Sequence, residues 1–292
     1  MTRRRRSSRD WRWGAARMLL LLLPLAPAAP AEGGLRVASL NVCSDQLVLM
    51  LADREEIASL SYYAADPSFS HFAERARGIP TNRGQAEELL AAAPTLVVGG
   101  TFSNPATQEL LARLGIPVLP LEVPADFAAI RAQVLSVARA LGHPDRGEAL
   151  VEEMDRRLDA LERGRRERVP LAAVYQENGI TPAKGTLIDA VIAAAGLENL
   201  GRRLGLFGYS ALSLEDLALA RPALLIHSIE AQDAPSLARQ VLSHPALEAV
   251  SKDAVRIVVP ASLWVCPGPY TVEAAELLAA ARDRVLTEGP GS

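Results

Sequence analysis

The sequence predicts an α/β protein of two lobes with parallel sheets, joined by a long rigid backbone helix. Strand-length and helix-length apolar segments alternate with short links over residues 35–121 and again over 170–286, as in parallel sheets. The intervening residues 122–169 have an almost entirely helical pattern. A motif of an acid pair, a helix, a proline and a buried strand also occurs once in each outer region. A chain of 292 residues with 49% apolar residues is large enough for two lobes.

The first lobe is expected over residues 35–121. Asn41 or Ser44 can cap its first helix, and Gly115 with Pro117 two residues later is typical of a helix end. Pro94 separates a helix from a β-rich apolar run. The pattern predicts strands at 35–40, 57–62, 95–99 and 118–121, and helices at 41–51, 85–92 and 104–114.

The connector is expected over residues 122–169, with helix from 125 to 161 that is interrupted at Gly142-His143-Pro144. Its second part, from Asp145 to about Arg163, would be about 28 Å long at 1.5 Å per residue. The highly charged run 162–168 follows, and we expect it to be a solvated helix end.

The second lobe is expected over residues 170–286, with strands at 171–175, 224–227 and 256–259 and helices at 187–195, 213–220 and 271–282. Residues 87–98 can be laid over residues 215–226, so that an acid pair opens each helix and a proline falls seven residues after the first acid. Acids favour the first turn of a helix, and Ser213 with Asp216 can form a capping box. That is a purely structural explanation for Glu87 and Glu215.

The first 31 residues are typical of a cleaved secretory signal. Seven arginines precede a short apolar run from Met18 to Ala26, and small residues precede Glu32. The run is about half of the roughly 20 residues that span a bilayer. We therefore expect a periplasmic protein, and no lipid anchor, because no cysteine lies at the cleavage point. The remaining chain is acidic without a basic stripe, which argues against nucleic-acid binding.

Catalytic and metal-binding patterns are weak. Ser44-Asp45 follows a predicted strand as a nucleophile turn would, but it has no glycine frame, so a hydrolase is a minor alternative. The four histidines show no paired spacing, so we expect no bare-metal site and solvent-facing rings: His71, His143, His227 and His244. Two cysteines exclude a disulfide-rich mini-fold and a four-cysteine zinc site.

Four stretches together resemble a known family: residues 36–41, 87–98, 114–118 and 213–226. They resemble the periplasmic substrate-binding proteins of ABC importers, in the helical-backbone class that handles vitamin B12 and ferric siderophores. The resemblance covers about residues 35–285. It implies a monomeric receptor, not an enzyme, that captures a corrinoid or a ferric siderophore and delivers it to a permease dimer. The ligand is then a metal chelate rather than a resident cofactor; a receptor for haem or a bare metal ion is the alternative.

The resemblance also implies site residues. Cleft aromatics of the family match Tyr63, Tyr209 (in a glycine-rich loop here) and Trp264, although Tyr63 and Trp264 could instead cover the core edge. Vitamin B12 binders carry an aromatic before the position of Glu87, where this chain has Thr81-Asn82-Arg83, so Asn82 is a candidate ligand contact.

Glu87 and Glu215 match the two glutamates that, in the resembled family, meet arginines on the permease subunits. Cys43 and Cys266 would both face the cleft if the lobes pair as the family implies. Three alternatives stay open for them: a disulfide across the cleft, a free thiol that contacts the ligand, or two buried inert thiols.

Overall fold

The computed structural model describes residues 34–100, 103–229, 245–250 and 252–288. The expected signal segment 1–31 and His244 lie outside the described residues. Among the helices of these ranges, none is both long enough and apolar enough to cross a bilayer. The described residues belong to one compact unit, which contains the two sheets and the helices between them.

The first sheet is entirely parallel, in the order β3-β2-β1-β4-β5. Asn41 caps the first helix, because its side chain accepts hydrogen bonds from the N–H groups of Cys43 and Ser44. The strands are β1 (Val37–Ser39), β2 (Ile57–Ser61), β3 (Thr81–Asn82), β4 (Leu96–Gly100) and β5 (Val118–Leu121). The helices are α1 (Val42–Leu51), α2 (Ala73–Ala76), α3 (Ala86–Ala91) and α4 (Pro105–Arg113), with a 3₁₀ turn η1 (Arg54–Glu56).

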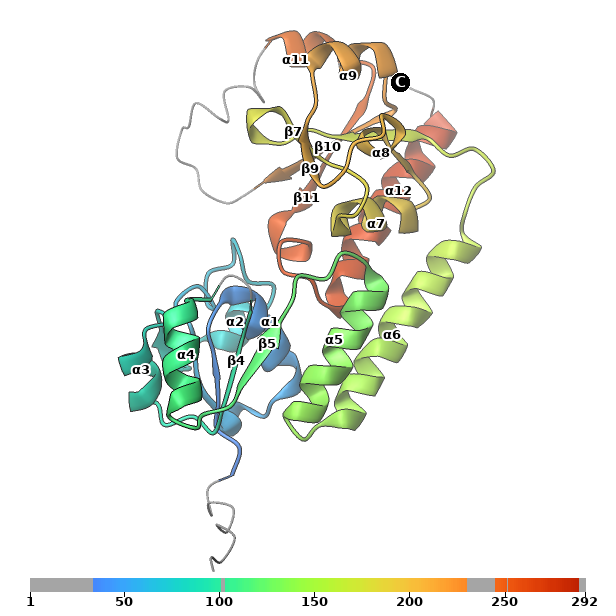
Figure 1. The fold of residues 1–292 in the computed structure, drawn as a ribbon. Coiled ribbons are helices and arrows are strands. Elements are labelled where there is room, and N and C mark those ends of the chain that lie inside the picture. The colour runs from blue at the N-terminus through green and yellow to red at the C-terminus, as the bar shows by residue number, and fades with distance from the viewer. Residues whose placement is uncertain (1–33, 101–102, 230–244, 251, 289–292) are drawn as a thin grey trace, which may run out of the picture. The chain divides into compact units, whose positions relative to one another are not determined.

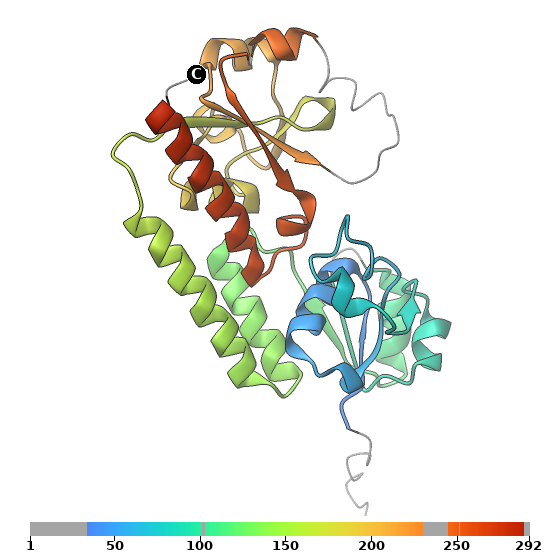
Figure 2. The same cartoon turned by 180° about the vertical axis from the view of Figure 1, so that it is seen from behind.

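Two long helices follow, α5 (Phe127–Ala140) and α6 (Pro144–Arg163), and they pack side by side (Figures 1 and 2). The expected break between them is confirmed at Gly142, whose positive φ of 79° turns the chain. The charged run after α6 is largely exposed as expected, but it is also tied to the rest of the chain. Arg166 forms an ion pair with Asp283 of the last helix.

The second sheet is parallel, in the order β11-β10-β6-β8, and a short antiparallel pair β7-β9 lies apart from it. Its strands are β6 (Leu171–Val174), β8 (Glu198–Asn199), β10 (Leu224–Ile229) and β11 (Val255–Pro260); the extra pair is β7 (Ile180–Pro182) and β9 (Tyr209–Ala211). The helices are α7 (Leu187–Ala194), α8 (Leu200–Arg203), α9 (Leu214–Ala220), α11 (Pro245–Val250) and α12 (Val272–Glu288), with 3₁₀ turns η2 (Glu177–Gly179), η4 (Ala261–Leu263) and η5 (Pro269–Thr271).

The position expected for Tyr209 was wrong. The residue opens strand β9 rather than lying in a glycine-rich loop, and it pairs with Pro182 of β7. A three-residue strand is too short to show a period-two pattern, so the glycines before it dominated the prediction.

The internal repeat is confirmed by the topology of the two sheets. β1 pairs with β4 as β6 pairs with β10, and Leu96 and Leu224, which coincide in the sequence overlay, occupy the same register position. The residue before each repeat proline, Ala93 or Arg221, has a left-handed conformation with φ of 47° or 44°. The repeat therefore describes a shared helix–turn–strand unit and not only a similar composition.

A single large hydrophobic core connects both sheets with the connecting helices. It includes nearly inaccessible residues from five helices: Leu47 of α1, Ile130 of α5, Met154 of α6, Val191 of α7 and Leu278 of α12. Helix α12 also runs beside α6, as both views show (Figures 1 and 2). Because α5, α6 and α12 share this core, the connector is packed along its length rather than exposed as a free linker.

Candidate functional site

Three adjoining pockets lie beyond the carboxyl ends of the parallel strands. The tyrosine pocket, of about 610 Å³, is lined by Leu40, Asn41, Val42, Ser61, Tyr62, Tyr63, Asn82 and Arg83. The tryptophan pocket, of about 420 Å³, is lined by Val123 to Ala125, Gln176, Gly185 to Ile188, Gly208, Tyr209, Trp264, Val265 and Pro267. A small floor pocket shares Asn41 with the first and Val123, Pro124, Val265 and Pro267 with the second. We call the three together the cleft.

The tyrosine pocket presents two adjacent aromatic rings where β2 ends. Tyr62 and Tyr63 are 59% and 52% exposed, although both carry large apolar surfaces. Tyr63 packs edge-on against Phe69, with ring centroids 5.6 Å apart, and the Arg83 guanidinium lies 5.4 Å from the centroid of Tyr62. Tyr62 was not among the predicted ligand contacts, although it follows the same strand as Tyr63.

Asn82 lines this pocket, but its side chain already has partners in the fold. The residue is 2% exposed. Its amide nitrogen lies within 3.0 Å of acceptors on Ser39, Ser59 and Leu60, and its oxygen accepts the N–H of Gly84 at 2.9 Å. These bonds fasten the end of β3, so the loop exposes the next residue, Arg83, toward solvent.

The tryptophan pocket combines one exposed and one buried aromatic. Tyr209 is 62% exposed, whereas Trp264 is 4% exposed and also belongs to the core. Phe207, which was not among the predicted ligand contacts, is 71% exposed and lies against Gly185 of the pocket wall. A Cβ at Gly185 would stand only 2.9 Å from that ring, so glycine permits this close approach.

Cys43 and Cys266 form a disulfide, with Cα atoms 4.7 Å apart and a sequence separation of 223. Of the three alternatives for these cysteines, the two with free thiols are therefore wrong for this structure. Cys43 lies in the first turn of α1 and lines the floor pocket. Val265 and Pro267, on either side of Cys266, line the same pocket. The bridge thus joins the amino-terminal half to the carboxy-terminal half at the floor of the cleft.

The two repeat glutamates are exposed and have no hydrogen-bond or ion-pair partner among the described residues. The second acid of each pair behaves differently. Glu88 accepts the N–H of Arg83 at 2.5 Å, and Asp216 bonds the Ser213 hydroxyl at the start of α9. Glu88 is therefore bonded to Arg83 in the loop before α3 and Asp216 to the cap of α9, whereas Glu87 and Glu215 are available to a partner.

The Ser44-Asp45 turn is structural rather than a presented nucleophile. Ser44 is 1% exposed, and its hydroxyl lies 2.7 Å from that of Ser39. Asp45 is fully buried and accepts hydrogen bonds from the N–H and hydroxyl of Ser61. Burial raises the pKa of Asp45 to about 6, against an ordinary value of 3.8.

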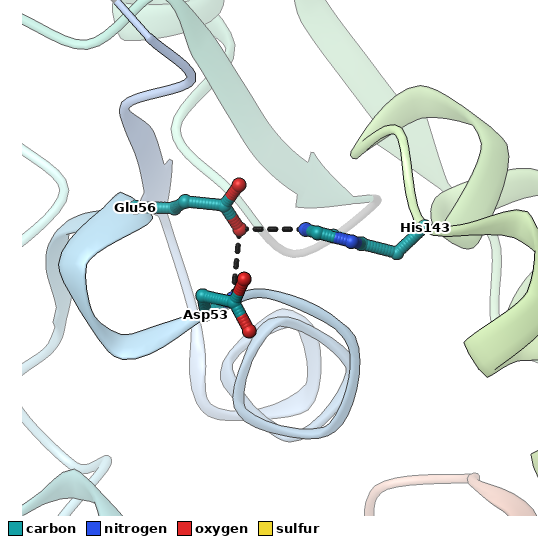
Figure 3. Close-up of side chains that lie close together, drawn as sticks. All are labelled: Asp53, Glu56 and His143. Atoms are coloured by element: carbon teal, nitrogen blue, oxygen red, sulfur yellow. Dashed lines mark hydrogen bonds and ion pairs between the residues drawn. The ribbon is translucent and has the colours of Figure 1, made fainter.

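The expectation of solvent-facing histidines was wrong for His71, His143 and His227, which are all partly buried. Burial lowers the pKa of His227. The His71 ring stacks on Tyr270 at 4.4 Å, and burial lowers the pKa of this histidine. His143, in the turn before α6, bonds Glu56 at 2.7 Å (Figure 3). Both contacts join segments far apart in the sequence, so spacing along the chain could not indicate them.

His143, Glu56 and Asp53 bring possible metal-ligand atoms within 4.8 Å of one another (Figure 3). The guanidinium of Arg146 already supplies a positive charge beside them, because it lies 2.8 Å from the Asp53 carboxylate. Its hydrogen bond is the main cause that lowers the pKa of Asp53. The Glu56 carboxylate accepts the Asp53 N–H at 2.7 Å as well. This cluster fastens the turn between α5 and α6 to the segment before β2, outside the cleft.

Comparison with known proteins identifies relatives of the whole fold. A family model described as periplasmic binding protein matches residues 37–258. The periplasmic heme-binding protein RhuT from Roseiflexus sp. RS-1 is 24% identical, with a TM-score of 0.70, over 85% of this chain and 99% of that chain. The periplasmic vitamin B12 binding protein BtuF of Vibrio cholerae is 20% identical, with a TM-score of 0.63, over 86% and 98%.

An ABC-type Fe3+-hydroxamate transport protein from Saccharomonospora viridis DSM 43017 is 19% identical, with a TM-score of 0.64, over 85% of this chain and 94% of that chain. A comparison with curated proteins finds no match. The similar structures confirm the predicted fold class, two parallel-sheet α/β regions with a helical backbone.

Proposed function

The chain belongs to the periplasmic binding protein family, and from that premise we propose that it is the receptor of an ABC importer for a metal chelate. The observation that carries the proposal is the cleft itself. Exposed aromatic rings from both halves of the chain, Tyr62 and Tyr63 on one and Tyr209 on the other, line adjoining pockets at the carboxyl ends of parallel strands. Ligands of open α/β sheets bind at such ends.

Within this class, the lining favours a flat tetrapyrrole, haem or a corrinoid, over an anionic siderophore. Among the described residues that line the three pockets, the charged ones are Arg83 and Glu122. A multiply charged catecholate complex needs more cations than this for compensation. Aromatic faces suit an extended apolar macrocycle, and a tyrosine oxygen is an established ligand of haem iron. Haem is therefore the first candidate, and corrinoid the second.

We propose Tyr63, Tyr209 and Trp264 as ligand contacts, with Asn82 as the residue that fixes the adjoining loop. The Cys43–Cys266 bridge forms part of the floor beneath the ligand. Because Trp264 is largely buried, its contact is confined to the edge of its pocket, whereas the exposed tyrosines offer their faces. The proposal includes export to the periplasm through cleavage of residues 1–31, a monomeric state, and no catalytic role.

We also propose that Glu87 and Glu215 dock the receptor on the two subunits of its permease. Their equivalent positions in the repeat, their exposure and the absence of partners among the described residues support this role. A receptor with two similar halves suits a twofold permease, because each half offers the same carboxylate to the same kind of basic residue.

A titration of residues 32–292 against haemin, cyanocobalamin, cobinamide and a ferric hydroxamate tests the ligand. Trp264 is the single tryptophan of this portion of the chain, so quenching of its fluorescence reports on the tryptophan pocket. We expect saturable quenching with haemin or a corrinoid, at a stoichiometry set by the cleft. No binding of any of the four chelates, with a folded protein by circular dichroism, would refute the proposed function.

A further inference from the structure

The segment from Trp264 to Tyr270 is fastened to the amino-terminal half at two points. Cys266 is bonded to Cys43 of α1, and the Tyr270 ring stacks on His71 at 4.4 Å with an interplanar angle of 4°. Phe72 packs edge-on against the same ring, at 5.4 Å. The Tyr270 hydroxyl donates to the carbonyl oxygen of Cys266, so the two attachments also brace each other.

The loop that carries Tyr63 is fastened to the same helix as the disulfide. Gln46 of α1 is fully buried; its amide nitrogen donates to Ser70 at 3.0 Å, and its oxygen accepts the N–H of Phe72 at 3.2 Å. Within the loop, Phe69 packs against the Tyr63 ring. Contacts from Cys266, Tyr270 and Gln46 therefore hold the loop at residues 70–72, and the short backbone segment from there to Phe69 leads to the ring that packs against Tyr63.

We infer that five residues form a clasp that positions Tyr63: Cys43, Gln46, His71, Cys266 and Tyr270. Residues of the carboxy-terminal half thereby fix the position of a ring in the tyrosine pocket, which belongs to the amino-terminal half. The loop at residues 62–72 exposes Tyr62 and Tyr63 in the tyrosine pocket. Asn82 and Arg83 of that pocket contact Tyr62, whereas the described contacts at the other end of the loop come from Gln46 and Tyr270. Without the clasp, Tyr63 would sample several rotamers and would lose entropy on binding. The clasp thus preorganises the pocket instead of closing over a ligand.

A physical consequence distinguishes the clasp from ordinary core packing. Breaking it should loosen one remote loop, whereas the loss of another buried tyrosine should not. Tyr175 is a matched control, because it is 3% exposed and belongs to a separate hydrophobic cluster of the carboxy-terminal half.

Amide hydrogen exchange of the ligand-free protein tests the inference directly. Tyr270→Leu and His71→Leu should each raise the exchange rate of residues 62–72 by about tenfold or more, and Tyr175→Leu should change it less than about twofold. Since Tyr270 is buried and its variant could fail to fold, the half-buried His71 provides the independent measurement. A combined Cys43→Ser and Cys266→Ser variant should act in the same direction. Unchanged exchange of this loop in folded His71→Leu protein would overturn the clasp.

A second measurement, which rests on the proposed function, uses haemin as the probe. Tyr63→Ala should weaken haemin binding by about thirtyfold in the natural chain but by less than about fivefold in the His71→Leu background, because the ring there is no longer preorganised. Equal losses in both backgrounds would contradict the positioning role. If haemin does not bind at all, the ligand proposal fails, whereas the exchange experiment still decides the clasp.

Discussion

Each half of the molecule buries one aspartate near the start of a helix, but the two carboxyl groups have different partners. In the amino-terminal half, Asp45 of α1 is fully buried and accepts hydrogen bonds only from neutral donors among its described partners, mainly Ser61. In the carboxy-terminal half, Asp189 of α7 is 2% exposed and bonds Asn199 at 3.0 Å and the guanidinium of Arg202. The shared topology therefore does not dictate shared electrostatics.

The comparison extends to the edge strands. Asn82 at the end of β3 and Asn199 at the end of β8 are both buried, and each oxygen accepts the N–H of a glycine two residues later. Both halves therefore end these strands with the same asparagine turn. The partners of the two buried aspartates differ, and Asp45, which has no described cation partner, lies in the half with the two exposed tyrosines.

The largest expected effect breaks the covalent link between the halves. The disulfide joins cysteines 223 positions apart in the sequence, and such a link restricts the unfolded chain most when the loop it closes is long. Replacing both cysteines by serine should lower the free energy of unfolding by about 4 kcal/mol. Denaturant titration of the oxidised natural protein and the double variant measures this loss. A loss below about 1 kcal/mol would mean that noncovalent packing alone holds the halves together.

The second prediction concerns Asp45 and pH. Its folded-state pKa of about 6 lies above the ordinary 3.8, so the folded protein binds more protons between these values. Stability from this residue is therefore present below about pH 4 and is lost as pH rises through 6. By pH 7 the loss should be about 3 kcal/mol, at about 1.4 kcal/mol per pKa unit.

Asp45→Asn is the matched variant for this measurement. An amide can still accept the Ser61 N–H and can donate to its hydroxyl, so the cavity stays filled. The difference in unfolding free energy between Asp45→Asn and the natural protein should be near zero at pH 4 and should grow to favour the variant by pH 7. A constant difference across this range would disprove the raised pKa.

The third prediction concerns the other aspartate. Arg202→Met removes the cation beside Asp189, and an unpaired buried carboxylate is strongly destabilising. Because the arginine side chain is 52% exposed, water replaces part of its contribution, and we expect a loss of about 2 kcal/mol in urea unfolding. Adding Asp189→Asn should restore much of that loss. No restoration would show that the arginine acts through packing rather than charge.

The sequence predicted what depends on local pattern. A cap at Asn41 or Ser44, the break at Gly142 and the repeat from Glu87 to Pro94 were predicted because caps, glycine turns and prolines act over a few residues, and the structure uses Asn41 as the cap. Strands β3, β7, β8 and β9 were missed because two or three residues carry no periodicity.

The site was predictable only in part, for a related reason. Tyr63 and Tyr209 could be picked as aromatics that follow strands or glycine-rich turns, and their contact with a ligand stays a prediction. The pairing of Cys43 with Cys266 could not be chosen, since it depends on a distance in space between segments 223 residues apart. The same holds for the stack of His71 on Tyr270, which is visible only once both halves are folded.

The smallest expected effect on stability belongs to the exposed repeat glutamates. Their variants compare the outer surfaces of the two halves instead of their interiors. Glu87 and Glu215 have no described partner, so Glu87→Ala with Glu215→Ala should change the unfolding free energy by less than about 0.5 kcal/mol and leave chelate affinity unchanged. Glu88→Ala is the control, because it removes the neighbouring acid, which accepts the N–H of Arg83 instead. If the two halves present equivalent docking acids, each single variant should reduce uptake in a reconstituted importer by a similar factor, and the double variant should nearly abolish it. Strongly unequal single effects would show that the permease meets only one half, and full uptake by the double variant would leave both residues as acids that merely favour the starts of their helices.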